Sequence, residues 1–162
     1  MSEQQFSLDA EQIAFREVIR KFAEDKIAPY AADSDHNSAY SWESFKALQQ
    51  MELTALSYPV EYGGSGASLV TQSVVAEELA RVCASTSLMF LISKLGMLPV
   101  INFGSEALKA KYLPRICTGE SQASYGLSEA DAGSDVASMT THAEKDGDSW
   151  VINGSKCWIT NA

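Results

Sequence analysis

The sequence is poor in features that mark several large classes of protein. Lys and Arg number 12 against 21 Asp and Glu, which gives a net charge of −9. Such a chain repels the phosphates of nucleic acids and anionic membranes, so neither is an expected partner. The acidic N-terminus lacks the basic and apolar segments of a signal peptide. The most apolar run, LMFLI at 88–92, falls short of the about 20 apolar residues of a membrane span and predicts a buried helix of a soluble protein.

Cysteine and histidine are also scarce. Cys83, Cys117 and Cys157 form no CxxC pair, and the two histidines, His36 and His142, are far apart in the chain. A structural zinc site usually has paired ligands at short spacing, so no metal site is expected. Reduced cysteines in an intracellular protein are the simplest interpretation of this number.

Most of residues 9–115 carries apolar side chains at steps of three and four, the pattern of amphipathic helices. The first helix should be capped by Ser7 or Asp9 and stop near Pro29, and the second should be capped by Ser41. The inner faces should include Trp42 on the second helix and, on the last, Leu108, Tyr112 and Leu113. The predicted helices cover residues 9–31, 41–51, 69–83, 86–103 and 105–116.

The pattern changes after Gly119 to one typical of strands, at residues 121–127, 139–145, 149–153 and 157–160. Asp146-Gly147-Asp148 is a turn signal, and Asn153-Gly154 predicts a hairpin turn between the last two strands. Helices followed by strands indicate an α domain at 1–120 and the start of a β domain at 121–162. About 40 residues are too few to close a typical β-sandwich or barrel, so we expect a truncated domain.

The glycine-rich stretch SYPVEYGGSGAS at 57–68 does not fit the known phosphate-binding patterns. A GxGxxG motif begun at Gly64 would need a glycine where Leu69 stands, and no Gly-Lys-Ser/Thr is present for a Walker loop. The stretch is therefore predicted to connect two helices through backbone conformations that favour glycine. No GxSxG motif surrounds any serine, so a nucleophilic serine is not indicated either.

The stretch YGLSEADAGSD at 125–135 combines carboxylates, hydroxyls and small residues. Glu129 and Asp131 are candidates for an acid–base couple, although two carboxylates in a loop are usually just solvated. Alternatively, the Ser128 hydroxyl and the unobstructed amides of Gly133-Ser134 can hold a ligand, including an anion. Physical chemistry alone leaves both interpretations open.

YGLSEADAGSD together with DSWVINGSKCWITNA at 148–162 resembles the flavin-binding signature of the acyl-CoA dehydrogenase family. The likeness extends backward through IAP at 27–29, PVEYGGSG, FGSE and KAKYLPRICTGE, and so covers nearly the whole chain. One departure is Ala130-Asp131, where the family usually has proline and a small residue; this predicts a looser, more acidic turn.

The resemblance implies a mainly α fold, an N-terminal α-helical bundle domain followed by the first strands of a truncated β domain. It implies an FAD-dependent oxidoreductase that removes hydrogens from Cα and Cβ of an acyl-CoA and passes electrons to an electron-transfer flavoprotein. It also implies a homotetramer or homodimer, in the bacterial cytoplasm or the mitochondrial matrix. Two rivals are a flavin-dependent oxidase or monooxygenase of the same fold and a non-catalytic helical binding protein.

Carried over by residue, the resemblance implies contacts on both sides of the flavin. One set lies along the ring, with the Ser128 hydroxyl in place of the commoner threonine; another reaches the pyrophosphate, with Ser134 also near the CoA part of the substrate; a third covers the other side of the ring. The family's general base is a glutamate in a C-terminal helical domain, so it is expected beyond Ala162 and no residue here is assigned to it. The residues implied to lie along the flavin ring are Tyr125, Leu127 and Ser128. Those implied to reach the pyrophosphate are Gly133 and Ser134, and those implied to cover the other side of the ring are Trp158, Ile159 and Thr160.

Overall fold

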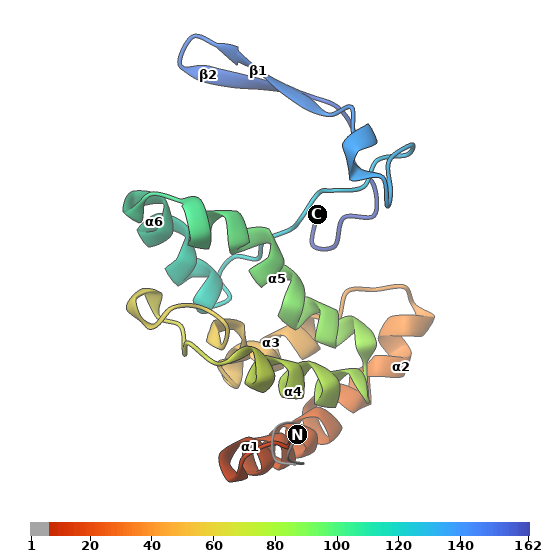
Figure 1. Ribbon diagram of the computed structural model, residues 1–162. Coiled ribbons are helices and arrows are strands. Elements are labelled where there is room, and N and C mark those ends of the chain that lie inside the picture. The colour runs from red at the N-terminus through yellow and green to blue at the C-terminus, as the bar shows by residue number, and fades with distance from the viewer. Residues whose placement is uncertain (1–6) are drawn as a thin grey trace.

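A bundle of helices makes up most of the protein, and a β-hairpin extends from its C-terminal side (Figure 1). The structure is a computed structural model that describes residues 7–162; residues 1–6 of the predicted first domain lie outside the described residues. The predicted order of helices followed by strands is confirmed. The elements are α1 (Ala10–Phe22), α2 (Ala28–His36), α3 (Trp42–Gln50), α4 (Leu69–Ala80), α5 (Ala84–Phe103), α6 (Glu106–Cys117), β1 (His142–Asp146) and β2 (Ser149–Asn153).

The first helix does not stop at Pro29 as predicted. A π-helical turn at Ala23–Ile27 follows α1, and helical structure then continues through α2 to His36. Proline has no N–H to give to the preceding turn, and the wider π turn accommodates that loss. Pro29 therefore lies in the first turn of a new α-helical segment, where a missing N–H costs little.

Side chains cap four of the helices at their N-termini. Asp9 accepts from the backbone N–H of Gln12, whose side chain in turn accepts from the Asp9 N–H, a capping box that selects Asp9 over Ser7. Ser41 accepts from the Ser44 N–H at 3.3 Å, as predicted. Ser68 and Ser105 cap α4 and α6 in the same way.

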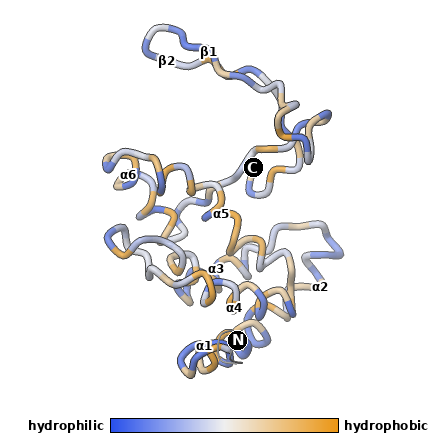
Figure 2. The backbone as a smooth tube through the Cα atoms, viewed as in Figure 1, coloured by the Kyte–Doolittle hydropathy of each residue, from blue (hydrophilic) through white to orange (hydrophobic). Residues whose placement is uncertain are grey.

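Two clusters of buried side chains form the core. The larger joins α1, α3, α4 and α5 and includes Ile19, Leu48 and Leu79; the smaller lies around Tyr58 and Leu113. Figure 2 shows hydrophobic residues recurring along the helices of the bundle, interspersed with hydrophilic ones. Three residues predicted on the inner faces of α3 and α6 are in fact exposed, although Phe45 and Leu113 on the same helices are buried: Trp42, Leu108 and Tyr112.

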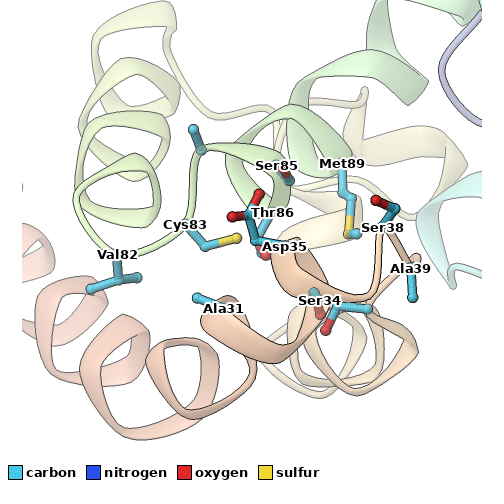
Figure 3. Close-up of a pocket in the computed structure, with 12 residues that line it drawn as sticks. Ala31, Ser34, Asp35, Ser38, Ala39, Val82, Cys83, Ser85, Thr86 and Met89 are labelled. Carbon is cyan, nitrogen blue, oxygen red and sulfur yellow. The ribbon is translucent and has the colours of Figure 1, made fainter.

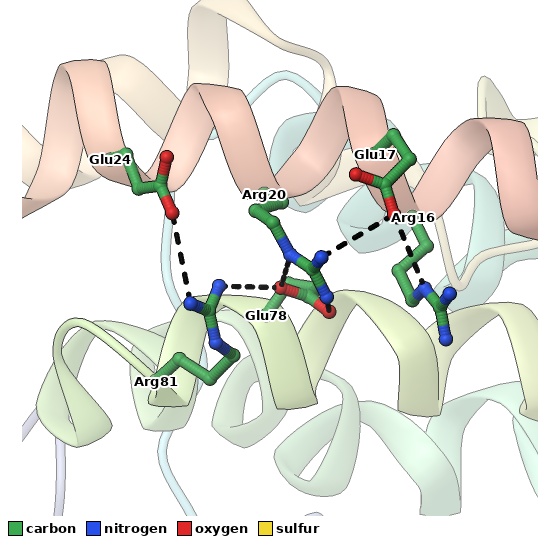
Figure 4. A network of polar contacts seen from close by, with 6 residues as sticks. All are labelled: Arg16, Glu17, Arg20, Glu24, Glu78 and Arg81. Atoms are coloured by element: carbon green, nitrogen blue, oxygen red, sulfur yellow. Dashed lines mark hydrogen bonds and ion pairs between the residues drawn. The ribbon is translucent and has the colours of Figure 1, made fainter.

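A network of ion pairs joins α1 to α4 (Figure 4). Glu78 on α4, whose side chain is only 2% exposed, accepts from Arg20 through both carboxylate oxygens, at 2.8 and 3.0 Å. Arg81 donates to the same carboxylate at 2.9 Å. These bonds hold the pKa of Glu78 below its usual value, chiefly through the hydrogen bond from Arg20, and fix how α1 lies on α4.

Helix α5 is long and apolar enough, by length and composition alone, to cross a membrane. A core helix of a soluble protein passes the same test, and 28% of the most apolar window of α5 is buried inside this structure. Its buried side chains, including Met89, Phe90 and Ile92, pack inside the bundle, whereas Leu88, Leu91 and Leu95 are exposed. The predicted buried helix is thus buried along one face.

The glycine stretch forms the predicted connection between helices. Its backbone makes a 3₁₀ turn at Val60–Tyr62 and reverses at Gly63, where φ is +90°. Gly64 passes so close to Tyr58 that an added Cβ would lie 2.7 Å from the Tyr58 Cβ. Only glycine satisfies both positions, so the stretch has a structural explanation without a bound phosphate.

The β region differs from the prediction in three places. Strand β1 pairs antiparallel with β2 through the turn at Asp146-Gly147-Asp148, and the other turn signal, Asn153-Gly154, joins no strands. Residues 121–127 and 157–160 are extended or turned but form no strand in the described part of the chain. A strand is defined by hydrogen bonds to a neighbouring strand, and residues 7–162 provide no such neighbour for either segment.

Candidate functional site

Two segments predicted to contact flavin lie side by side, although about thirty residues separate them in the chain. We call Tyr125–Ser128 the first loop segment and Trp158–Thr160 the second. The Cys157 N–H, just before the second segment, donates to the Ser128 carbonyl oxygen at 2.9 Å. Beside the two segments, Asn161 Nδ2 donates to the Ala123 oxygen at 3.3 Å. Within them, Ile159 Cδ1 lies 3.7 Å from where a Cβ on Gly126 would be.

These loop segments expose flat rings and free hydrogen-bond donors. Trp158 is 92% exposed and has φ of +59°, a left-handed conformation that is unusual for a bulky residue and that turns the ring outward. Tyr125 is also exposed. Within residues 7–162, the hydroxyls of Ser128 and Thr160 make no hydrogen bond to the protein. Exposed aromatic faces next to unpaired hydroxyls suit a flat ligand with a polar edge.

A tight turn links the first loop segment to Gly133 and Ser134. The Glu129 N–H donates to the Ala132 oxygen at 2.9 Å, and the Ala132 N–H donates back at 3.3 Å. Ala132 is buried, so the turn is closed rather than loose, although Asp131 at its tip is exposed. No protein atom lies within 4 Å of where a Gly133 Cβ would be, which leaves its backbone open to a ligand.

The Glu129 carboxylate is fully occupied with protein partners. It accepts from Lys156 Nζ at 2.9 Å, from the Thr140 N–H and hydroxyl at 2.8 and 2.9 Å, and from the Thr141 N–H at 2.9 Å. These bonds, above all the one from Lys156, hold the pKa of Glu129 far below its usual range. A carboxylate held ionised in this way is a poor general acid or base, so the geometry argues against the Glu129–Asp131 couple.

Lys156 is the residue of this site that the sequence reasoning missed. Its ammonium group donates to Glu129, to the Leu127 carbonyl oxygen at 2.9 Å and to the sulfur of Met139 at 3.2 Å. A glutamate and a lysine 27 positions apart give no local signal of an ion pair. The only hint is that each falls inside a stretch that carries the family resemblance.

A separate cavity of about 430 Å³ lies between the C-terminal end of α2 and the start of α5 (Figure 3). Its wall includes Ser34, Asp35, Cys83 and Met89, together with Thr86, whose buried hydroxyl has no partner within the described residues. None of the eight implied flavin-binding residues lines it. Across residues 7–162, no three His, Cys, Asp or Glu side chains come close enough together to hold a metal ion.

Comparison with known proteins matches both parts of the chain to one family. The family model for the acyl-CoA dehydrogenase N-terminal domain matches residues 9–120, and that for the middle domain matches residues 124–162. A relative from Mycobacterium leprae, named a probable acyl-CoA dehydrogenase, is 48% identical over 156 residues, which are 96% of this chain and 40% of that protein.

Solved structures agree in fold. A chain in the structure of an electron transferring flavoprotein of Acidaminococcus fermentans has a TM-score of 0.88 and 30% identity, over 96% of this chain and 41% of that one. An acyl-CoA dehydrogenase complexed with FAD from Bacillus anthracis has a TM-score of 0.84 and 29% identity, over 99% of this chain and 28% of that one.

The chain thus spans about 40% of the length of the curated relative that it matches. The two family models together cover its helical bundle and both loop segments. The chain belongs to the acyl-CoA dehydrogenase family.

Proposed function

We propose that this chain is the N-terminal part of an FAD-dependent acyl-CoA dehydrogenase that introduces a double bond between Cα and Cβ of an acyl-CoA thioester. In the tests below, the full-length form is a protein in which residues 1–162 are followed by the part that the relatives have in addition. It is produced from the continuing coding sequence or as a chimera with the remainder of the Mycobacterium leprae relative.

One observation carries the proposal: the adjacency of the two loop segments, with their rings and hydroxyls left free. The donor set fits FAD, because the ring system is flat and apolar on its faces and polar along its pyrimidine edge. The Ser128 and Thr160 hydroxyls would serve that edge, and Trp158 and Tyr125 would cover ring surface. The open backbone at Gly133-Ser134 would receive the pyrophosphate, with Ser134 also close to the CoA part of the substrate.

When bound, the flavin supplies the two-electron acceptor for the hydrogen that leaves Cβ. The residues of this chain bind and orient; they do not supply the base. Glu129 is held ionised by Lys156 and Asp131 lies at an exposed turn, so neither is placed to take the proton from Cα. We assign that proton transfer to a residue of the full-length form outside 1–162.

The proposal includes an electron-transfer flavoprotein as the electron acceptor. The likeness to the Acidaminococcus fermentans structure supports this choice over molecular oxygen. A homotetramer or homodimer in the bacterial cytoplasm or the mitochondrial matrix is part of the same proposal, and light scattering of the full-length form tests the assembly.

Anaerobic mixing of the full-length form with acyl-CoA thioesters of different chain lengths tests the function. The flavin absorption should bleach with at least one thioester and return when an electron-transfer flavoprotein is added. Return with oxygen alone, together with peroxide release, would identify an oxidase instead. A full-length form that carries flavin but is bleached by no thioester would refute the dehydrogenase assignment.

A further inference from the structure

One ion pair lies where three separate stretches of the chain meet. Glu129 follows the first loop segment, Lys156 precedes the second, and Thr140-Thr141 leads into β1. The Glu129 side chain is 7% exposed and that of Lys156 is 23% exposed, so the pair is largely withdrawn from water. Ion pairs in such places are shielded from salt and depend on good geometry.

Besides its bond to Glu129, Lys156 also donates a hydrogen bond to the backbone of the first loop segment. Lys156 Nζ donates to the Leu127 carbonyl oxygen, directly before Ser128. The residue after Lys156 is Cys157, whose N–H donates to the Ser128 oxygen. Bonds from two consecutive residues therefore hold the peptide groups on both sides of the Ser128 Cα, from which its hydroxyl projects.

No strand pairing holds these loops within the described chain. Residues 121–128 and 154–162 belong to no strand, and the hairpin β1–β2 lies apart from the helices (Figure 1). Within residues 7–162, the order of the site therefore rests on one backbone bond, from the Cys157 N–H to the Ser128 oxygen, and on the side-chain bonds of Glu129 and Lys156. A ligand site works only when its contact residues are held in place by a second set of interactions.

We propose that Glu129 and Lys156 are positioning residues that hold the two loop segments at the spacing the flavin ring requires. This inference rests on the proposed function, since it concerns the same site. Neither side chain needs to touch the flavin. They act by keeping the Ser128 hydroxyl and the Trp158 ring in register with each other.

The donor and acceptor pattern makes the pair difficult to replace. Both Glu129 oxygens accept from N–H or O–H donors, so the amide of Glu129→Gln would point an NH₂ group at one of them. Lys156→Met keeps most of the length but loses every hydrogen bond of the ammonium group. An exchange of the charges, Glu129→Lys with Lys156→Glu, cannot restore the arrangement, because the new lysine would face the Thr140 and Thr141 N–H donors.

The test compares variants of the full-length form by FAD dissociation constant, by the shape of the visible flavin absorption band, and by amide exchange at Cys157. Glu129→Gln and Lys156→Met should each weaken FAD binding about tenfold or more, as loss of a group that orients a ligand-binding residue does at metal sites. They should also blur the fine structure of the absorption band and speed amide exchange at Cys157. The exchanged pair should behave like the single variants.

Two controls separate positioning from general destabilisation. Glu120→Gln removes a carboxylate from an exposed pair with Arg115 (2.9 Å) and should change none of the three readings. The double variant Arg20→Met, Arg81→Met leaves the buried Glu78 carboxylate unpaired in the helical bundle and should lower the unfolding temperature without changing the flavin absorption band. Normal FAD affinity and absorption in both Glu129→Gln and Lys156→Met would overturn the inference.

Restoration of FAD binding by the exchanged pair would also overturn it, because simple charge attraction would then suffice. A wild-type full-length form that holds no FAD would instead overturn the proposed function. In that case amide exchange at Cys157 in the 162-residue chain still decides whether the pair orders the loops.

Discussion

The buried carboxylate of Glu78 predicts that the α1–α4 network depends far more on its cations than on its anion. Glu78 is only 2% exposed, whereas Arg20 and Arg81 are 35% and 45% exposed. Removing the carboxylate leaves two partly solvated cations, and removing both cations leaves a buried charge without a partner. These two changes break the same bonds but should have very different costs.

The magnitudes follow from what each change leaves behind. In Glu78→Leu, Arg20 still has Glu17 at 3.4 Å and Arg81 still has Glu24 at 3.7 Å. An apolar group in place of a buried ion is often neutral or better, so we expect a loss of less than about 1 kcal/mol in the free energy of unfolding. In the double variant Arg20→Met, Arg81→Met, the unpaired Glu78 carboxylate should cost about 3–5 kcal/mol.

The pH dependence distinguishes the two cases further. In the wild type the folded-state pKa of Glu78 is lowered, so its pairing stabilises the fold above the unfolded value of 4.5 and is lost as the pH falls through the folded value. In the double variant, burial without cations raises the pKa, so the carboxyl takes up a proton as the pH falls and its penalty disappears. The difference in the free energy of unfolding between the wild type and the double variant should therefore be largest at neutral pH and shrink below about pH 5.

Urea unfolding of the 162-residue chain, followed by far-UV circular dichroism at about pH 7 and about pH 4.5, measures these differences. Arg115→Met, which breaks an exposed pair with Glu120, is the matched control and should cost less than about 1 kcal/mol. A Glu78→Leu variant as unstable as the double variant would refute the reasoning. So would a difference that stays constant as the pH is lowered.

Four further changes test separate parts of the structure. Tyr58→Phe removes a buried hydroxyl that has no partner within residues 7–162 and should raise the free energy of unfolding by about 1 kcal/mol in urea titrations. Gly154→Ala should speed amide exchange in the hairpin, because φ is +151° and the new Cβ would lie 2.6 Å from the Thr141 Cβ. In the full-length form, Ser128→Ala should lower the flavin reduction potential through loss of a hydrogen bond worth about 1.5–3 kcal/mol, whereas Ser128→Thr should leave the potential nearly unchanged. Trp158→Ala should reduce flavin content after gel filtration, because it removes ring-covering area rather than a polar contact.

The helices could be predicted because their signals are local. Asp9 and Ser41 are N-cap residues, a residue type that predicts where a helix begins. Apolar residues spaced three and four apart predict helical segments wherever one helix face is buried in the bundle. The end at Pro29 was wrong because a proline can also begin a new turn, and only the geometry of the preceding π turn decides between the two. Trp42, the first residue of α3, is exposed although its ring contacts the buried Phe45, and the spacing of apolar residues does not encode how far the bundle covers the end of a helix.

The residues of the candidate site could be predicted from the sequence, but their arrangement in space could not. Both loop segments carry recognisable motifs, so their residues could be named from the sequence. The contact between the two loop segments and the Glu129–Lys156 ion pair join residues that are distant in the sequence, so no local sequence pattern predicts them. Glu129 drew attention as a loop carboxylate, but only its four hydrogen bonds distinguish an ordering group from a catalytic one.

The wrong strand assignments and the ion pair have one physical origin. Apolar alternation marks a segment able to pair, and pairing still needs a neighbour; in residues 7–162 only β1 and β2 find one, and Trp150 and Ile152 on β2 stay exposed. A hairpin of two strands is marginally stable in water, so it cannot by itself fix the loops that lead into and out of it. Side-chain bonds from Glu129 and Lys156 to the backbone at Leu127 and Thr140-Thr141 provide the fixed geometry that a sheet would otherwise give. For this reason a single charge removed at Glu129 should disturb the loops more than a single apolar side chain removed from the hairpin.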